Sequence, residues 1–261
     1  MIVIFIAAAV LLSIIMTGAW VLQRATGNSG WVDVVWSFGL GVAGLVLALL
    51  PGGPTTRQIV VAGLIAAWSL RLGLHIAQRS MHGPEDARYA ALRQEWGTRF
   101  QVRLFLFLQI QAAAAALLAL SMMLAAHNPA PFPRALDIAG IVVLLIAVVG
   151  EGVADEQLRR FKKNPANKGR VCDAGLWGWS RHPNYFFEWF GWVAYPLLAI
   201  SGDWWLGWLA WSGPALMYWL LVHVSGIPLL EQQMLQSRGD AFRAYQTRVS
   251  AFFPLPPKDF S

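Results

Sequence analysis

Long apolar runs alternate with polar segments along most of this chain. Crossing the hydrocarbon core of a bilayer takes about 20 mostly apolar residues in a helix, and several runs approach or reach that length. The pattern therefore predicts an all-α, polytopic membrane protein with seven transmembrane helices. The expected spans are residues 1–22, 34–50, 58–78, 104–126, 136–153, 184–200 and 204–224.

The connections between these runs are of two kinds. Pro51-Gly52-Gly53-Pro54 and Asn128-Pro129-Ala130-Pro131 are predicted to be tight turns, because these residue types end regular structure. Three connections are long and polar instead: residues 79–103, residues 154–183 and the tail from residue 225 onward. No internal repeat or low-complexity linker divides the chain, so a single transmembrane domain over residues 1–261 is expected.

Lys and Arg are distributed very unequally over the loops. With the N-terminus outside the cytoplasm, 17 of the 20 basic residues fall on the inner side. Arg57 and Arg134 fall on the outer side, and Arg71 lies within the third span. Because cytoplasmic loops of membrane proteins carry an excess of Lys and Arg, this asymmetry predicts an outer N-terminus and an inner C-terminus.

The composition agrees with a membrane protein and excludes other classes. Hydrophobic residues make up 57% of the chain and charged residues 13%, whereas a soluble domain is about 25% charged. The net charge of +6 does not indicate nucleic-acid binding, because the basic residues lie in loops where they orient the chain or meet lipid headgroups. The single cysteine, Cys172, excludes an internal disulfide. The tryptophans from Trp177 to Trp219 are typical of interfacial membrane anchors.

Two patterns that suggest binding have simpler explanations. Gly39, Gly41 and Gly44 match the GxGxxG dinucleotide fingerprint, but that fingerprint works only between a strand and the start of a helix. Here it lies inside an apolar run, where small residues let membrane helices pack closely. His82 and His182 lack metal-ligand spacing, so no metal site is expected.

The polar segment at residues 155–188 holds the strongest candidate for a site. Pro183 suits the first turn of a helix, since proline loses no hydrogen bond there, and Asn184 and Glu188 then share one face, one turn apart. Polar residues at that depth are costly unless they face a cavity or a partner. The Arg and Lys residues ahead of them suit an anionic ligand. A basic loop that obeys the charge rule, with Asn and Glu pairing between helices, explains the segment equally well.

Three more polar groups lie within the apolar runs. Asp33 begins the second span, and Arg71 and His75 lie one turn apart on the third. A structural ion pair and a proton relay explain them about equally well. The loop that follows contains Glu85-Asp86-Ala87-Arg88-Tyr89, which suits a helix cap or a segment that closes over a ligand.

The sequence resembles a superfamily of membrane enzymes, which comprises the steroid 5α-reductases, the sterol C14/C7 reductases and the isoprenylcysteine carboxyl methyltransferases. It looks most like a bacterial branch of unknown function, the DUF1295-like proteins, which is similar to steroid 5α-reductase. The residues that carry the resemblance are Arg181-His182-Pro183-Asn184-Tyr185 with Glu188, Glu85-Asp86-Ala87-Arg88-Tyr89, the run from Arg170 to Trp177, and Glu231, Tyr245 and Pro254.

The resemblance implies a seven-helix enzyme of the bacterial inner membrane that holds NADPH between its helices and cytoplasmic loops. It implies hydride transfer to the C=C bond of a hydrophobic enone, a 3-oxo-Δ4 steroid or a similar lipid, which enters from the bilayer. The residues that it assigns to the cofactor are Asp155, Arg159, Asn167, Arg170, Arg181, His182, Asn184, Tyr185, Glu188 and Glu231.

An enone reductase also needs a group that polarises the carbonyl and supplies a proton, because negative charge develops on that oxygen. Steroid 5α-reductases use a Gln-Glu pair at the start of the second span and a Tyr in the third. This sequence lacks the Gln-Glu pair and has Asp33 near the Gln position and His75 near the Tyr position, with Tyr89 on the following loop. These three are the candidate catalytic residues, and Asp33 is the first choice.

Another activity fits part of the same motif. S-adenosylmethionine-dependent methyltransferases of lipidic substrates also carry Arg-His-Pro-x-Tyr, but a small residue tends to follow their Tyr, whereas Phe186, Phe187 and Glu188 follow here. A methyl donor also has no 2′-phosphate to match the basic residues of 159–170. The reductase is therefore favoured over the methyltransferase. A transporter or scaffold ranks third, because the polar residues crowd one membrane face.

Overall fold

The computed structural model describes residues 2–82 and 87–258, so Glu85 and Asp86 of the loop motif lie outside the described residues. Within these ranges every regular element is helical. The chain forms two compact units. Unit 1 comprises residues 1–141 and 195–213, and unit 2 comprises residues 142–194 and 214–261. Each unit is built from two separate stretches of sequence, and the single domain expected from the sequence stays a prediction.

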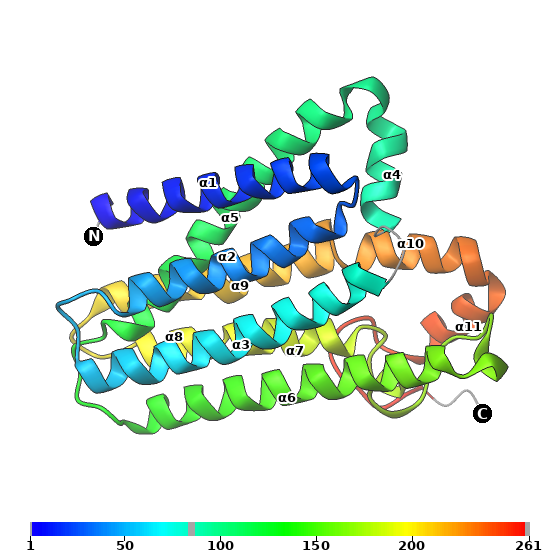
Figure 1. Ribbon diagram of the computed structural model, residues 1–261. Coiled ribbons are helices and arrows are strands. Elements are labelled where there is room, and N and C mark those ends of the chain that lie inside the picture. Colours follow the sequence, from blue (N-terminus) through cyan, green and yellow to red (C-terminus); the bar gives the residue numbers. More distant parts are fainter. Residues whose placement is uncertain (1, 83–86, 259–261) are drawn as a thin grey trace. The chain divides into compact units, whose positions relative to one another are not determined.

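Unit 1 is a bundle of long helices (Figure 1). Its elements are α1 (Ile2–Thr26), α2 (Gly30–Ala48), α3 (Thr55–His82), α4 (Ala87–Trp96), the 3₁₀ turn η1 (Gly97–Arg99), α5 (Phe100–Ala126), the first two turns of α6 (Ala135–Lys163), most of α8 (Ala194–Ala199) and the 3₁₀ helix η4 (Trp205–Trp211). Helix α2 packs against α1, α3 and α5, which makes it the centre of this bundle.

The glycines of the GxGxxG pattern explain how α2 reaches three neighbours. A side chain at Gly41 would collide with Ser69 of α3, and one at Gly44 would collide with Met122 of α5. Gly39 faces α1 in the same way. The prediction that these glycines serve helix packing is confirmed, since they lie inside a helix and leave room for its neighbours.

A buried ion pair joins several segments of unit 1. The guanidinium of Arg57 and the carboxylate of Asp137 are both 0% exposed and lie 2.6 Å apart. Arg134 bonds the same carboxylate at 2.8 Å. The two arginines also donate to the backbone carbonyl oxygens of Leu198 and Ile200. Both basic residues that the sequence places on the outer side are therefore held by structural contacts.

Unit 2 carries the polar segment singled out in the sequence. Its elements are α6 from Val142 onward, the 3₁₀ turns η2 (Pro165–Asn167) and η3 (Gly175–Gly178), α7 (Pro183–Trp192), α9 (Ser212–Trp219) from Pro214 onward, the π-helix η5 (Leu220–Val224), α10 (Ile227–Arg238) and α11 (Asp240–Arg248). Helix α7 begins at Pro183, which confirms the helix start predicted from that proline.

Helices α6 and α7 pack closely through small residues. A side chain at Gly150 would collide with the ring of Phe187, and one at Gly191 would lie 3.3 Å from the Cβ of Ala147. The facing residue number on α7 falls as the number on α6 rises. The two helices are therefore antiparallel, and positions that face each other can be read from this register.

Six helical stretches are long and apolar enough to cross a membrane: Ile2–Thr26, Gly30–Ala48, Thr55–Met81, Arg88–Ala126, Ala135–Lys163 and Trp205–Arg238. A helical membrane protein is therefore supported. The predicted span 184–200 is not among the six, because α7 ends at Trp192 and α8 begins at Ala194. The seventh span and the orientation of the two ends stay predictions.

The last of these stretches is not a continuous α-helix. It contains a 3₁₀ helix, α9 and the π-helix Leu220–Val224, and then breaks at Gly226. A side chain at Gly226 would collide with the backbone oxygen of Leu221, so this break requires glycine. Helix α10 begins directly after this break, at Ile227 (Figure 1).

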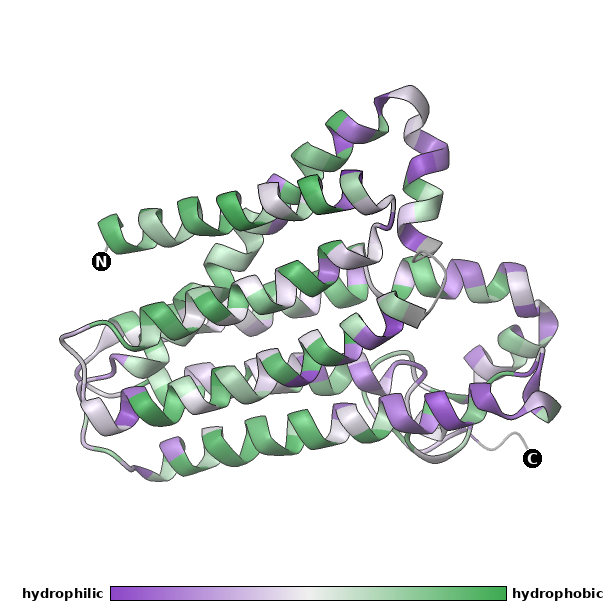
Figure 2. Ribbon diagram, in the orientation of Figure 1, coloured by the Kyte–Doolittle hydropathy of each residue, from purple (hydrophilic) through white to green (hydrophobic). Residues whose placement is uncertain are grey.

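Helix α6 is longer than a bilayer requires. Its 29 residues correspond to about 43 Å at about 1.5 Å per residue, whereas the hydrocarbon core is about 30 Å thick. Figure 2 shows that α6 is hydrophobic along most of its length and hydrophilic in its last turns. Its C-terminal end therefore carries polar side chains beyond an apolar layer.

Replacing Asp137 with Leu is expected to destabilise the protein by about 3–5 kcal/mol, because it leaves the fully buried guanidinium of Arg57 without its carboxylate. Thermal unfolding of the purified protein in detergent measures this change. The double variant Arg57→Met/Asp137→Leu should recover part of the loss, since it removes both charges. Arg243→Met, at an exposed position of α11, is the control. A single variant as stable as the control would contradict the structural role of the pair.

Candidate functional site

The end of α6 is shaped by residues that stop helices. The side chain of Asn164 accepts a hydrogen bond from the amide of Ala166 at 3.0 Å, and Pro165 takes the first position of η2. Gly169 follows with a φ of 84°, a conformation that favours glycine. The side chain of Asn167, predicted to bind the cofactor, donates to the carbonyl oxygen of Phe161 at 3.0 Å.

Six basic side chains are exposed around this turn. They are Arg159, Arg160, Lys162, Lys163, Lys168 and Arg170. Arg159 and Arg160 both bond the carboxylate of Glu156, Arg159 at 2.6 Å. In the described part of the chain Lys163, Lys168 and Arg170 have no carboxylate partner. The turn therefore carries positive charge that its own carboxylates do not neutralise.

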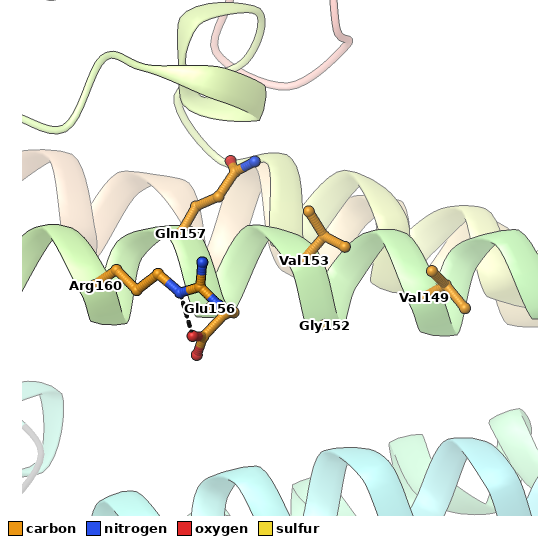
Figure 3. Close-up of a pocket in the computed structure, with 6 residues that line it drawn as sticks. All are labelled: Val149, Gly152, Val153, Glu156, Gln157 and Arg160. Atoms are coloured by element: carbon orange, nitrogen blue, oxygen red, sulfur yellow. Dashed lines mark hydrogen bonds and ion pairs between the residues drawn. The ribbon is translucent and has the colours of Figure 1, made fainter.

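One face of α6 changes from apolar to charged along its length. Figure 3 shows the six residues that line a surface hollow there: Val149, Gly152, Val153, Glu156, Gln157 and Arg160. Their spacing of three and four residues places them on one side of the helix. A side chain added at Gly152 would meet no atom within 4 Å, so this glycine keeps the middle of the hollow open.

The Gly175-Leu176-Trp177 motif fastens the loop to α6. The side-chain oxygen of Gln157 accepts a hydrogen bond from the amide of Leu176 at 3.0 Å. The indole of Trp177 donates to the carbonyl oxygen of Ala154 at 2.9 Å. Gly175 has a φ of 62° and lies against Gln157, where a side chain would collide. This part of the resemblance is therefore explained by packing.

Polar side chains meet where α6 and α7 face each other. The amide nitrogen of Asn184 donates to Asp155 at 3.2 Å. One turn away on each helix lie Glu151 and Glu188, which are 6% and 7% exposed. Because the helices are antiparallel, these two carboxylates lie at about the same level. The indole of Trp192 donates to Glu188 at 2.9 Å.

Glu151 was missed in the sequence, although a signal was present. It is a lone carboxylate near the end of an apolar run and stands four residues before Asp155. Ionisable residues inside membrane segments are functional candidates by default. With Asp155, Asn184 and Glu188 it forms a set of hydrogen-bonding side chains directly ahead of the basic turn.

Glu231 of α10 joins the first two residues of the Arg-His-Pro-Asn-Tyr motif. Its Oε1 accepts a hydrogen bond from Arg181 Nε at 2.7 Å and lies 3.1 Å from His182 Nε2. Its Oε2 accepts a hydrogen bond from the side chain of Gln246 on α11 at 2.7 Å. Three residues predicted to bind the cofactor therefore bind one another. Gln246 was not predicted, since nothing in its sequence context pairs it with a residue so far away.

Burial lowers the pKa of His182 below its ordinary value of 6.5, although Glu231 acts to raise it and Arg181 to lower it further. The carboxylate of Glu231 accepts hydrogen bonds from Arg181 and Gln246, so it fixes the proton of a neutral His182 on Nε2. The imidazole also stacks on Tyr185, with ring centroids 5.6 Å apart. His182 is therefore a neutral, tightly held side chain near pH 7.

In unit 1, Asp33 meets two residues that follow α3. It forms an ion pair with Arg88 and accepts a hydrogen bond from the hydroxyl of Tyr89 at 2.9 Å. Tyr89 is only 2% exposed. The structure thus brings together Asp33 and Tyr89, two of the three predicted catalytic residues. The third, His75, lies on α3 one turn after Arg71 and is not among these partners of Asp33.

The chain matches a protein family over most of its length. The family described as "Protein of unknown function (DUF1295)" matches residues 19–249. This chain belongs to the DUF1295 family. The matched range includes every candidate residue of both units, from Asp33 to Gln246. The DUF1295 part of the resemblance is confirmed, while its link to the steroid reductases and a bacterial origin stay predictions.

Two relatives accompany the DUF1295 match. One is an uncharacterized protein of Schizosaccharomyces pombe, 26% identical over 280 residues, which covers 96% of this chain and 79% of the yeast protein. The other is the probable O-methyltransferase ustE of Ustilaginoidea virens, 41% identical over 46 residues, which covers 18% of this chain and 16% of that protein. No solved structure matches this DUF1295 protein.

The buried, neutral His182 predicts a pH dependence of stability. Its pKa is lower in the folded protein than in the unfolded chain, so the unfolded chain binds more protons at acidic pH. Its contribution to stability is therefore complete above about pH 6.5, the unperturbed His pKa, and is lost as the pH falls toward the folded pKa. Thermal unfolding in detergent between pH 8 and pH 5 measures this loss.

His182→Gln should flatten this acid dependence, because glutamine does not titrate. His223→Gln, at an exposed position, should leave it as steep as in the parent. If stability falls equally steeply with pH in both variants, titratable groups other than His182 cause the loss.

Proposed function

We propose that this DUF1295 protein is a membrane-embedded reductase that uses NADPH to reduce the C=C bond of a hydrophobic enone. A 3-oxo-Δ4 steroid or a similar lipid, entering from the bilayer, is the substrate class. The observation that carries the proposal is the order of charges along α6. Glu151 and Asp155 come first, and the exposed cations of residues 159–170 follow directly.

This order of groups fits NADPH, whose phosphates need cations and whose ribose hydroxyls and carboxamide need hydrogen-bond partners. The exposed side chains of Lys163, Lys168 and Arg170 suit the phosphates. Asp155 and Asn184 suit the hydroxyls and the carboxamide. When bound, the nicotinamide supplies the hydride. The residues of the chain bind and orient the two ends of the cofactor.

The contacts of unit 1 favour Tyr89 as the proton donor. Asp33 accepts hydrogen bonds from both Arg88 and Tyr89, so in this arrangement its carboxyl group serves as an acceptor. For proton transfer, the Tyr89 O–H turns from Asp33 toward the substrate carbonyl oxygen on which charge develops. We therefore assign Asp33 and Arg88 to the orientation of Tyr89, and the first choice made from the sequence moves from Asp33 to Tyr89.

The proposal places the basic turn and the C-terminus on the cytoplasmic side of an inner membrane, with seven spans and an outer N-terminus. The excess of Lys and Arg on that side supports this orientation. Reporter fusions at the two ends measure it directly. Cytoplasmic signal from both ends would require an even number of spans.

A second candidate activity is methyl transfer from S-adenosylmethionine to a lipidic substrate. The similarity to the probable O-methyltransferase ustE favours it, although that similarity covers 46 residues. S-adenosylmethionine carries no phosphate, so the exposed cations of residues 159–170 would have no ligand group to bind. The identity of the bound nucleotide therefore distinguishes the two activities.

The purified protein is expected to bind NADPH at least tenfold more tightly than NADH, which is about 1.4 kcal/mol, because exposed cations stabilise the additional 2′-phosphate. Isothermal titration in detergent measures both affinities. The triple variant Lys163→Gln/Lys168→Gln/Arg170→Gln should lose most of this preference. The control variant Arg243→Gln/Lys258→Gln removes exposed cations elsewhere in unit 2 and should keep it.

Asn184→Ala and Glu188→Ala should abolish NADPH binding in protein that stays folded. Equal affinities of the parent for NADPH and NADH would remove the phosphate argument. Binding of S-adenosylmethionine with neither nucleotide would establish the methyltransferase instead.

Tyr89→Phe is expected to lower the turnover of an enone such as progesterone by about 100-fold or more, because a general acid contributes about 10²–10⁴-fold. Its NADPH affinity should equal that of the parent. Mass spectrometry of the product measures turnover. Asp33→Asn should cause a smaller loss, since it disturbs the orientation of the donor. A larger loss of turnover in Asp33→Asn than in Tyr89→Phe would make Asp33 the proton donor. Full turnover in both variants would make His75 the donor.

A further inference from the structure

The last residues of unit 2 run beside the start of the Arg-His-Pro-Asn-Tyr motif. The amide of Arg181 donates to the carbonyl oxygen of Ser250 at 2.8 Å. The hydroxyl of Ser180 donates to the carbonyl oxygen of Phe252 at 2.8 Å. These bonds connect the motif to the tail, whose residues 249–258 are mostly apolar and Pro-rich.

Two more contacts extend this attachment. The amide of Leu255 donates to the carbonyl oxygen of Trp179 at 3.0 Å. The guanidinium of Arg181 donates to the carbonyl oxygen of Val249, which is 4% exposed and packs with residues of α11. The tail from Val249 to Leu255 therefore contacts both the backbone and the side chain of Arg181.

Phe252 anchors this tail. It is 4% exposed, and its ring centroid lies 5.9 Å from that of Phe186, 5.7 Å from that of Trp189 and 5.5 Å from that of Tyr218. All three pairs are edge-to-face, the arrangement that aromatic rings prefer. The next residue, Phe253, is 45% exposed. The two neighbouring phenylalanines thus differ sharply in burial.

Hydrogen bonds through Ser180 connect Phe252 with the first turn of α7. The hydroxyl of Ser180, which donates to Phe252, also accepts a hydrogen bond from the amide of His182 at 3.1 Å. His182 directly precedes α7, and Asn184 lies in the first turn of that helix. Displacement of Phe252 would therefore release the segment that sets where Arg181, His182 and Asn184 stand.

We propose that Phe252 is a positioning residue, and that the tail from Val249 to Leu255 is a strap that holds the start of α7 in its ligand-binding arrangement. The strap rests on the contacts above, and only the choice of NADPH as its ligand rests on the proposed function. The DUF1295 match ends at residue 249. All but the first residue of the strap therefore lie beyond the matched range.

Hydrogen exchange followed by mass spectrometry tests the strap in the full-length protein. Phe252→Ala should speed exchange of the amides from Trp179 to Phe186, because the carbonyl oxygens of Ser250 and Phe252 are no longer held where Arg181 and Ser180 donate to them. Peptides from α1, α2 and α3 should exchange as in the parent, which shows that the variant is folded. Leu255→Ala is the matched control, because the Leu255 side chain is 54% exposed and its backbone bond to Trp179 is kept, so the same amides should stay protected. Phe252→Tyr, which keeps the ring, should restore protection.

The affinity for NADPH, measured on the same variants, tests the positioning role. Phe252→Ala should bind NADPH at least tenfold more weakly, and Phe252→Tyr should recover most of the affinity. Parental exchange rates in Phe252→Ala would overturn the strap. Faster exchange with unchanged NADPH affinity would overturn the positioning role. If Phe252→Ala exchanges faster than the parent but neither protein binds NADPH, the strap is supported and the proposed function is overturned.

Discussion

A charged group among apolar helices is stable only when it has a partner, because the lipid around it offers no water to take the partner's place. In unit 1 this constraint applies to Arg57 and Asp137, whose side chains are fully buried. In unit 2 it applies to Glu231, which takes bonds from Arg181 and His182. These pairings join residues 80 and 50 positions apart in the chain. Charge pairing thus decides which loops and helix ends meet, while hydropathy decides only where the helices run.

The sequence predicted the features that depend on neighbouring residues. Hydropathy located the long helices, and Pro183 marked the start of α7. The sequence did not predict the end of α7 at Trp192 or the π-helix Leu220–Val224, since these breaks depend on how helices pack rather than on composition. The family resemblance named Glu231, Arg181 and His182 as site residues but not the bonds between them, because no sequence spacing connects α10 with the motif 50 residues earlier.

The residues of the Arg-His-Pro-Asn-Tyr motif have two different roles. Its first two residues, Arg181 and His182, are occupied by Glu231, so they build the frame of the site. Asn184 instead faces Asp155 beside the exposed cations of residues 159–170, where a phosphate-bearing ligand has groups to bind. Under the proposed function, Arg181 and His182 keep the site in shape, and the basic helix end beside Asn184 selects the ligand.

The long separation of Arg57 from Asp137 has a consequence for how the protein is made. A ribosome adds about 5–20 residues per second, so the 80 residues between the two take about 4–16 s to synthesise. Once α3 is complete at His82, its first turn carries a guanidinium without the carboxylate that later neutralises it. The Arg57–Asp137 ion pair that holds α3 can therefore form only after the start of α6 has been synthesised. The cell's insertion machinery therefore has to tolerate, for several seconds, an arginine that lacks its carboxylate partner.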